Sequence, residues 1–488
     1  MSRLARALVA IAVAAAALVV GVAWSFASPP VSSPDEDYHL GSIWCPPPAE
    51  ESGCRMGTVD GKPVVWVPEV MAQRPCYVGR LGDSAACQDE LSATELVPSI
   101  RFDQGDYPGQ YYRIMHAFVG PDLDRSVLTM RVVNVVVAVL LVGAALVLAQ
   151  PHAGRAATYA LFAGLVPTGV FIVASVNPSS WAFVGLTTLW IALNSLAQAS
   201  GTALRVANGA LAVSGAVLAS VARGDTGPFV AVIVLALGLL HVRRRPDRGW
   251  LAVAAITLAV GAWSYLGSGQ AGVAPTVTDV EGRNFGEVLA HNLVEILQVP
   301  AGILGVGPWG ALGWLEIPMP TSVHVPTISL AGMLLFQGLR RLDRRKALAL
   351  AVVAGALLAL PFYMLMRNLE IAGIQPRYVM SLLPLLFALC LLHPGAVAAY
   401  RFTRAQAVLA WVMVTTAHSV ALLTTLRRYV TGLDGSYLLG RGGEWWWSSG
   451  PSPLAWWLAG SAAYGLAALT LVATAGIERP AASVGRHE

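Results

Sequence analysis

Long apolar runs separated by short polar segments fill most of the sequence. A helix needs about 20 apolar residues to cross the hydrocarbon core of a membrane, and the chain contains about twelve runs of that length. The pattern therefore predicts an all-α polytopic membrane protein with about 12 transmembrane helices. The runs cover residues 6–27, 126–149, 156–175, 179–198, 204–221, 226–242, 250–267, 322–339, 347–366, 378–398, 405–426 and 453–476.

The composition supports this class of protein. The chain has 488 residues, of which 56% are hydrophobic and 12% are charged, whereas an ordinary soluble domain has about 25% charged residues. So few charges could not cover the surface of a soluble protein. This balance excludes a soluble enzyme, a disordered protein and a DNA-binding factor.

Lys and Arg in short loops predict which way the helices cross, because such loops stay in the cytoplasm. Two arginines precede the first run, and alternation of the spans then places three basic stretches on the same side, at residues 243–248, 340–346 and 401–404. The N-terminus and the C-terminal tail, residues 477–488, are therefore expected in the cytoplasm. The expected location is the plasma (inner) membrane, crossed many times.

The polar segments between the runs divide the chain. Residues 1–27 are interpreted as a signal-anchor and first transmembrane helix, because the apolar run is long and an acidic motif follows it at once; a cleaved signal peptide is the alternative. Residues 28–125 then form an extracytoplasmic loop, and residues 268–321 an extracytoplasmic or re-entrant one. The remaining parts are residues 126–267 with transmembrane helices 2–7, and residues 322–476 with transmembrane helices 8–12 and an outer loop at 427–452.

Four of the five cysteines, Cys45, Cys54, Cys76 and Cys87, lie in the first outer loop. In an oxidising compartment they predict two disulfides, with three possible pairings. Sequential pairing, Cys45–Cys54 and Cys76–Cys87, is favoured by proximity alone. A zinc site is the alternative, and the wide spacing without a CxxC motif disfavours it. The fifth, Cys390, is interpreted as a packing residue in a span.

An acidic motif follows the first run, where Pro34 precedes Asp35, Glu36, Asp37 and His39. Crowded carboxylates raise one another's pKa, which suits a general base or a divalent metal. Asp35, Glu36 and His39 are therefore candidate catalytic residues, and the three carboxylates could together hold a metal ion. The alternative is a solvated acidic turn that ends a helix.

Basic residues at the predicted outer boundary are the second group of candidates. Arg377 and Tyr378 open the tenth run, Arg283 lies in the 268–321 loop, and Arg427 follows the eleventh run. An arginine there can hold a phosphate through two hydrogen bonds, or it can extend toward lipid headgroups. The loop could line a lipid substrate or form a structural lid. No nucleotide-binding motif is found. Lesser candidates are residues 177–180 and 223–225.

The two motifs resemble those of a bacterial membrane-protein family known as domain of unknown function 2142. Its members have a Pro-Asp-Glu-x-x-His element after the first span, which here is Pro34, Asp35, Glu36 and His39. They also have a late Gln-Gly-Arg-Tyr element, which here is Gln375, Pro376, Arg377 and Tyr378, with Pro in place of Gly. The composition, rich in Ala, Val and Arg and poor in Lys, is typical of actinobacteria.

That family is similar in organisation to the GT-C glycosyltransferases. The resemblance implies a GT-C-like fold and transfer of a sugar from a polyprenyl-phosphate donor to a cell-envelope glycan or glycolipid on the outer face. Arg377, Tyr378, Arg283 and Arg427 would bind the donor phosphate. No cofactor is certain, although a divalent metal is compatible with the acids, and no nucleic acid is expected as a partner. The alternatives are a transporter or flippase of a lipid-linked or anionic substrate, and a non-catalytic envelope-assembly protein.

Overall fold

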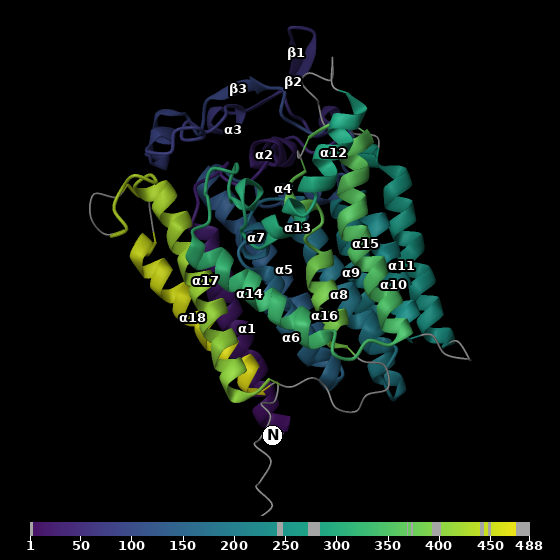
Figure 1. The fold of residues 1–488 in the computed structure, drawn as a ribbon. Coiled ribbons are helices and arrows are strands. Elements are labelled where there is room, and N and C mark those ends of the chain that lie inside the picture. Colours follow the sequence, from purple (N-terminus) through teal and green to yellow (C-terminus); the bar gives the residue numbers. More distant parts are fainter. Residues whose placement is uncertain are drawn as a thin grey trace, which may run out of the picture.

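The computed structural model describes residues 3–241, 247–271, 284–367, 369–371, 374–392, 402–439, 444–447 and 450–474. Long helices stand side by side. Residues 28–125, the predicted extracytoplasmic loop and from here on called the first outer segment, cover one end of the helices, opposite the N-terminus (Figure 1). The prediction of a mainly helical protein with membrane-spanning helices is confirmed.

Seven helices in the described part of the chain are long and apolar enough to cross a membrane. An eighth is counted if α12 (Phe285–Glu295) forms one span with the segment Gln298–Gly310, which contains α13 (Gln298–Ile303); the two parts meet at an angle of 46°. The seven are α1 (Arg3–Phe26), α5 (Leu123–Leu148), α9 (Thr202–Ala222), α11 (Arg248–Gly267), α15 (Arg344–Arg367), α17 (Arg404–Val430) and α18 (Pro453–Thr474).

The predicted number of about 12 spans is not confirmed, although every predicted run overlaps a helix. Pro167 divides one run into two helices, because proline has no N–H to continue the hydrogen-bond ladder. Another run forms a helix that is buried along its whole length and carries Ser, Thr and Asn. The shorter or more polar helices are α6 (Pro151–Leu165), α7 (Thr168–Val173), α8 (Pro178–Leu196), α10 (Thr226–His241), α14 (Thr321–Gly338) and α16 (Leu382–Leu391).

The first outer segment contains a small antiparallel sheet, so the expectation of an all-α protein needs correction. Asp60 and Gly61, both with positive φ, make a two-residue turn that pairs Val59 with Lys62, and this is the turn that fits the twist of a hairpin. The strands are β1 (Met56–Val59), β2 (Lys62–Pro68) and β3 (Leu96–Ser99), in the order β1-β2-β3.

Short helices and two disulfides complete this segment. Cys45 is bonded to Cys54 and Cys76 to Cys87, as sequential pairing predicted, while Cys390 is a buried free thiol. The helical elements are α2 (Glu36–Trp44), η1 (Ala49–Glu51), α3 (Glu69–Ala72), η2 (Ala85–Glu90) and α4 (Gln110–His116); elsewhere η3 (Gly269–Ala271), η4 (Pro308–Gly310) and η5 (Pro376–Tyr378) are single turns.

The first outer segment packs directly on the long helices. Its apolar core, which includes Leu40 of α2, Val65 of β2 and Tyr112 of α4, continues into Met130 of α5 and Trp181 of α8. The acidic motif at the start of α2 therefore lies between a folded outer segment and the ends of the membrane helices.

Candidate functional site at the end of the first helix

The turn that joins α1 to α2 is held in place by Arg131 of α5. Its guanidinium donates hydrogen bonds to the carbonyl oxygens of Ser25 (2.9 Å), Ser28 (2.6 Å) and Pro29 (2.8 Å). The turn ends at Asp35, whose φ of 57° is left-handed, a conformation that Asp tolerates better than most residues. Three carbonyl contacts and a fixed backbone give the acidic motif one defined position.

Glu36 is buried and paired with the same arginine. Both side chains are almost inaccessible, with exposed fractions of 0% for Glu36 and 1% for Arg131, and their closest atoms are 2.9 Å apart. Glu36 also accepts hydrogen bonds from the backbone N–H groups of Ser33 (3.1 Å) and Val176 (3.2 Å). This carboxylate therefore ties α1, α5 and the α7–α8 turn together and does not face a ligand.

Asp35 and Arg377 bring the two sequence motifs into direct contact. The Arg377 guanidinium on η5 forms an ion pair with the Asp35 carboxylate and donates to the carbonyl oxygen of Pro34 at 2.9 Å. Asp35 is the accessible partner, with 36% of its side chain exposed against 4% for Arg377. Nε of Arg377 is buried, and none of the described residues accepts a hydrogen bond from it.

Arg101 of the first outer segment binds the other side of the motif. Its guanidinium lies 3.1 Å from Asp35 and 2.8 Å from Asp37, and 40% of its side chain is exposed. Asp35 therefore bridges two arginines, one from the outer segment and one from the late motif.

A third arginine, Arg223 at the end of α9, completes the cluster. It is paired with Asp225 and donates to Ser179 Oγ at 3.1 Å. Its guanidinium lies over the rings of Tyr378, at 5.0 Å from the centroid, and Tyr107, at 5.8 Å. We call Arg101, Arg223 and Arg377, with Asp35 between two of them, the arginine cluster.

His39 lies beneath this cluster and is not exposed. Its Nδ1 is 3.0 Å from the hydroxyl of Tyr112, and its ring packs against Tyr107 and Tyr112. Burial lowers the pKa of His39 well below its usual range; Asp35 opposes this shift, and the nearby arginines add to it. The imidazole is therefore neutral at physiological pH and supports the rings under the acidic motif.

The pKa of Asp35 is set by opposing effects. Burial raises it, but the charge of Arg377 and its hydrogen bond, together with the charge of Arg101, outweigh burial, so that the pKa lies well below its usual range. Asp35 is therefore ionised at neutral pH and, while paired with the arginines, it is a weak base.

The acidic motif does not form a metal centre in this arrangement. No group of three or more His, Cys, Asp or Glu side chains in the described residues is placed to hold a metal ion. Glu36 turns toward Arg131, whereas Asp35 and Asp37 turn toward Arg101 and Arg377. Guanidinium groups occupy the carboxylate oxygens that a cation would need.

Arg427, another predicted phosphate ligand, lies away from the arginine cluster. It donates to the carbonyl oxygens of Leu433 and Gly435 and stacks on Tyr437, so these contacts join it to the segment that follows α17. Arg283 lies outside the described residues.

The 268–321 loop reaches the acidic turn through its last part. Trp314 Nε1 donates to the carbonyl oxygen of Val31 at 2.9 Å. The neighbouring Glu316 is buried and accepts a hydrogen bond from the hydroxyl of Tyr429 at 2.9 Å. This part of the loop packs on the turn that holds Asp35.

Sequence reasoning missed Arg101 and Tyr107 and ranked residues 177–180 and 223–225 as lesser candidates. Their position alone could have ranked residues 177–180 and 223–225 higher as candidates, because both stretches fall at outer ends of predicted spans. Arg101 carries no such signal, since it lies in the middle of a polar segment.

The fold and site together define a multi-pass membrane protein with a charged cluster at one end of its helices. A family model described as "Predicted membrane protein (DUF2142)" matches residues 18–386, and the chain belongs to that family. The match includes both motifs that meet at Asp35 and Arg377. No curated protein and no solved structure matches the chain.

Proposed function

We propose that this protein is a membrane glycosyltransferase of the GT-C type, with about 12 transmembrane helices, in the plasma membrane of an actinobacterium. It would transfer a sugar from a polyprenyl-phosphate donor to a cell-envelope glycan or glycolipid. The termini would lie in the cytoplasm and the site on the outer face.

The contact between Asp35 and Arg377 is the observation that carries this proposal. It places a partly exposed carboxylate between two guanidinium groups, with the third, that of Arg223, over the ring of the adjacent Tyr378. Arginines suit a phosphate because their planar groups donate two parallel hydrogen bonds. The Nε–H of Arg377, which has no acceptor among the described residues, offers a further donor.

The roles follow from exposure and charge. Asp35 accepts the proton of the acceptor hydroxyl, whose oxygen attacks the anomeric carbon. The bond from that carbon to the phosphate oxygen breaks, and the polyprenyl phosphate leaves with the electron pair and with inversion of configuration. Arg377, Arg101 and Arg223 stabilise the leaving phosphate, and Tyr378 holds the guanidinium planes. Glu36 and His39 are positioning residues.

Donor binding would also activate the base. An arginine that turns to a phosphate gives up part of its interaction with Asp35, and the pKa of Asp35 then rises toward its usual value. The carboxylate becomes a stronger base when the donor is in place, which favours transfer over reaction in the empty site.

The test is transfer by purified protein, reconstituted with a labelled polyprenyl-phosphate sugar and an envelope glycan acceptor. Asp35→Asn should lower transfer by at least about a hundredfold, the usual contribution of a general base, without lowering protein level. Glu50→Gln, an exposed acid of the same outer segment, is the matched control.

A second variant tests the phosphate. Arg377→Lys keeps the charge but loses the paired hydrogen bonds, so it should weaken donor use, whereas the exposed Arg74→Lys should not. Full activity of Asp35→Asn would remove its role as the base. Movement of the labelled lipid across a vesicle without transfer would indicate a flippase, and a co-purifying envelope protein without either activity would indicate an assembly protein.

A further inference from the structure

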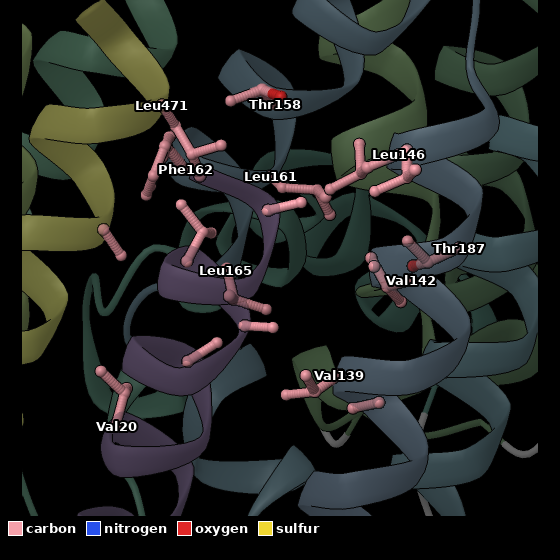
Figure 2. A pocket seen from close by; sticks show the side chains of 18 of the residues that line it. Val20, Val139, Val142, Leu146, Thr158, Leu161, Phe162, Leu165, Thr187 and Leu471 are labelled. Carbon is pink, nitrogen blue, oxygen red and sulfur yellow. The ribbon is translucent and has the colours of Figure 1, made fainter. Parts of the chain in front are cut away.

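An apolar cavity of about 520 Å³ lies within the membrane helices, away from the arginine cluster. It is lined by α1, α5, α6, α7, α8 and α18, and Figure 2 shows Val20, Val139, Val142, Leu161 and Leu165 around the same space. A volume of this size is typical of ligand sites in proteins.

The cavity exists because α1 and α5 touch at one end and separate at the other. At the outer end, a Cβ added at Gly21 would lie 2.2 Å from a methyl group of Val135, so the two helices are in close contact there. Further along α5, a Cβ added at Gly143 would meet nothing within 4 Å, although Gly143 lines the cavity. The space therefore widens toward the turn between α5 and α6.

The cavity is long, and it ends at a basic residue. Its lining on α1 runs from Val9 to Gly21, which at 1.5 Å per residue is about 18 Å, more than half of the hydrocarbon core. Arg155 of α6 lines the wide end, beside the α5–α6 turn. Because α5 starts next to the first outer segment, that turn is the end of α5 remote from the arginine cluster (Figure 1).

We propose that this cavity is a binding site for one acyl chain of an anionic glycerophospholipid, whose phosphate lies at Arg155 in the membrane leaflet remote from the arginine cluster. An elongated apolar space at membrane depth suits a hydrocarbon chain, and a guanidinium at its open end suits a phosphate headgroup. The close contact of Gly21 and Val135 closes the other end. That contact separates this site from the proposed donor, whose phosphate lies at the outer end.

The bound chain would support the site at a distance. Arg131, one turn beyond Val135 on α5, holds the end of α1 and Glu36. A chain that fills the space between α1 and α5 keeps these two helices in fixed positions. The proposal does not depend on the proposed function, because lipid binding is measured without any transfer reaction.

The experiment uses the full-length protein in nanodiscs of phosphatidylcholine with a minor fraction of phosphatidylglycerol that carries a photoreactive diazirine on one acyl chain. After irradiation, labelled peptides are mapped by mass spectrometry. Labelling should concentrate on residues 9–21 of α1 and 135–147 of α5.

The variants separate the cavity from the general lipid-facing surface. Gly143→Leu fills the space without a backbone clash and should lower this labelling by about tenfold or more, equivalent to about 1.4 kcal/mol. Gly355→Leu is the matched control, because Gly355 lies in a span with equally open space but does not line the cavity. Gly143→Ala, a smaller change, should have an intermediate effect. Arg155→Gln should remove the preference for phosphatidylglycerol over a phosphatidylcholine probe.

Three outcomes would overturn the proposal. One is equal labelling of the wild type and Gly143→Leu, when thermal unfolding shows both to be folded. Another is labelling spread evenly over lipid-facing helices, which indicates surface lipid only. The third is displacement of the probe by polyprenyl phosphate, which would assign the cavity to the donor chain instead.

Discussion

Asp35 has one carboxylate and two arginine partners, and this arrangement determines its titration. Its folded pKa lies below the ordinary value of 3.8, so the ion pairs contribute their full stability above pH 3.8 and lose it as the pH falls through the lower folded value. If a phosphate draws the arginines away, the pKa rises in the complex.

We therefore expect the acid limb of kcat to lie at a higher pH than the acid limb of kcat/KM, because the first reports the donor complex and the second the free protein. Both limbs are measured from initial transfer rates over a pH series. Coincident limbs, or the opposite order, would contradict activation of Asp35 by the donor.

Glu36 and Asp35 differ in exposure. Both members of the Glu36–Arg131 pair are buried, whereas Asp35 is partly exposed. Glu36→Ala leaves Arg131 in the interior without a counter-charge, which should lower the free energy of unfolding by about 3–5 kcal/mol. Asp35→Asn keeps an oxygen that can accept a hydrogen bond from the buried Arg377, and Arg101 keeps its pair with Asp37, so this variant should cost less, about 1–2 kcal/mol. Denaturant unfolding in detergent compares the two, and equal losses would show that Glu36 is not the structural acid.

Glu316 makes stability depend on pH in the opposite direction. Burial raises its pKa from 4.5 to about 7, although the hydrogen bond from Tyr429 lowers it. Its contribution is full below pH 4.5 and is lost as the pH rises through about 7, with a slope of up to about 1.4 kcal/mol per pH unit.

Glu316→Gln should remove this slope. The difference in thermal unfolding between the wild type and the variant reports Glu316 alone, because the contribution of His39 is present in both proteins and cancels. An unchanged difference from pH 5 to pH 8, a range of about three units, would show that Glu316 does not titrate there.

At the scale of elements, apolar periodicity located the helices but not their breaks. Runs of Ala, Val and Leu identify α1, α5 and α18 without ambiguity, since only a helix satisfies the backbone in lipid. Pro167 could have predicted the break between α6 and α7. Asp60 and Gly61 between β-branched residues could have predicted the hairpin. This signal was not used, because residues 28–125 were treated as a loop.

The disulfide between Cys76 and Cys87 closes a loop that docks on a membrane helix. Arg428 of α17 donates to the carbonyl oxygens of Tyr77 (2.7 Å) and Asp83 (2.6 Å) in that loop. Replacing both cysteines with Ala should lower the free energy of unfolding by about 2–4 kcal/mol, measured under non-reducing conditions. Cys390→Ala, which removes a buried thiol without a disulfide, is the control, and an equal loss there would contradict the expectation.

At the scale of the molecule, the sequence located the two charged motifs but did not predict which other residues contact them. Both motifs were found because ionisable side chains clustered where a predicted span leaves the membrane are unusual. The partner of Asp35 from the outer segment, Arg101, could not be found, because its position depends on how α2, α4 and the sheet pack. Arg427 shows the reverse: it lies at a suitable boundary, but its guanidinium caps its own loop.

The orientation is tested on the intact membrane. Ala93→Cys lies on the first outer segment, and Leu342→Cys lies between α14 and α15, and both positions are exposed. A membrane-impermeant thiol reagent added to whole cells should label the first and not the second, and both should react after lysis. Labelling of Leu342→Cys in intact cells would reverse the predicted topology.

The ion pair of Asp35 with Arg377 also has a consequence for synthesis of the protein. The two residues are 342 positions apart, so ribosomes release the acidic turn long before its late partner exists. Glu36 and Arg131 are much closer in sequence, so they can pair early and fix the conformation of the turn before Arg377 is synthesised. A chain that stops before Arg377 would then hold the acidic turn through Arg131 but leave Asp35 without its late partner.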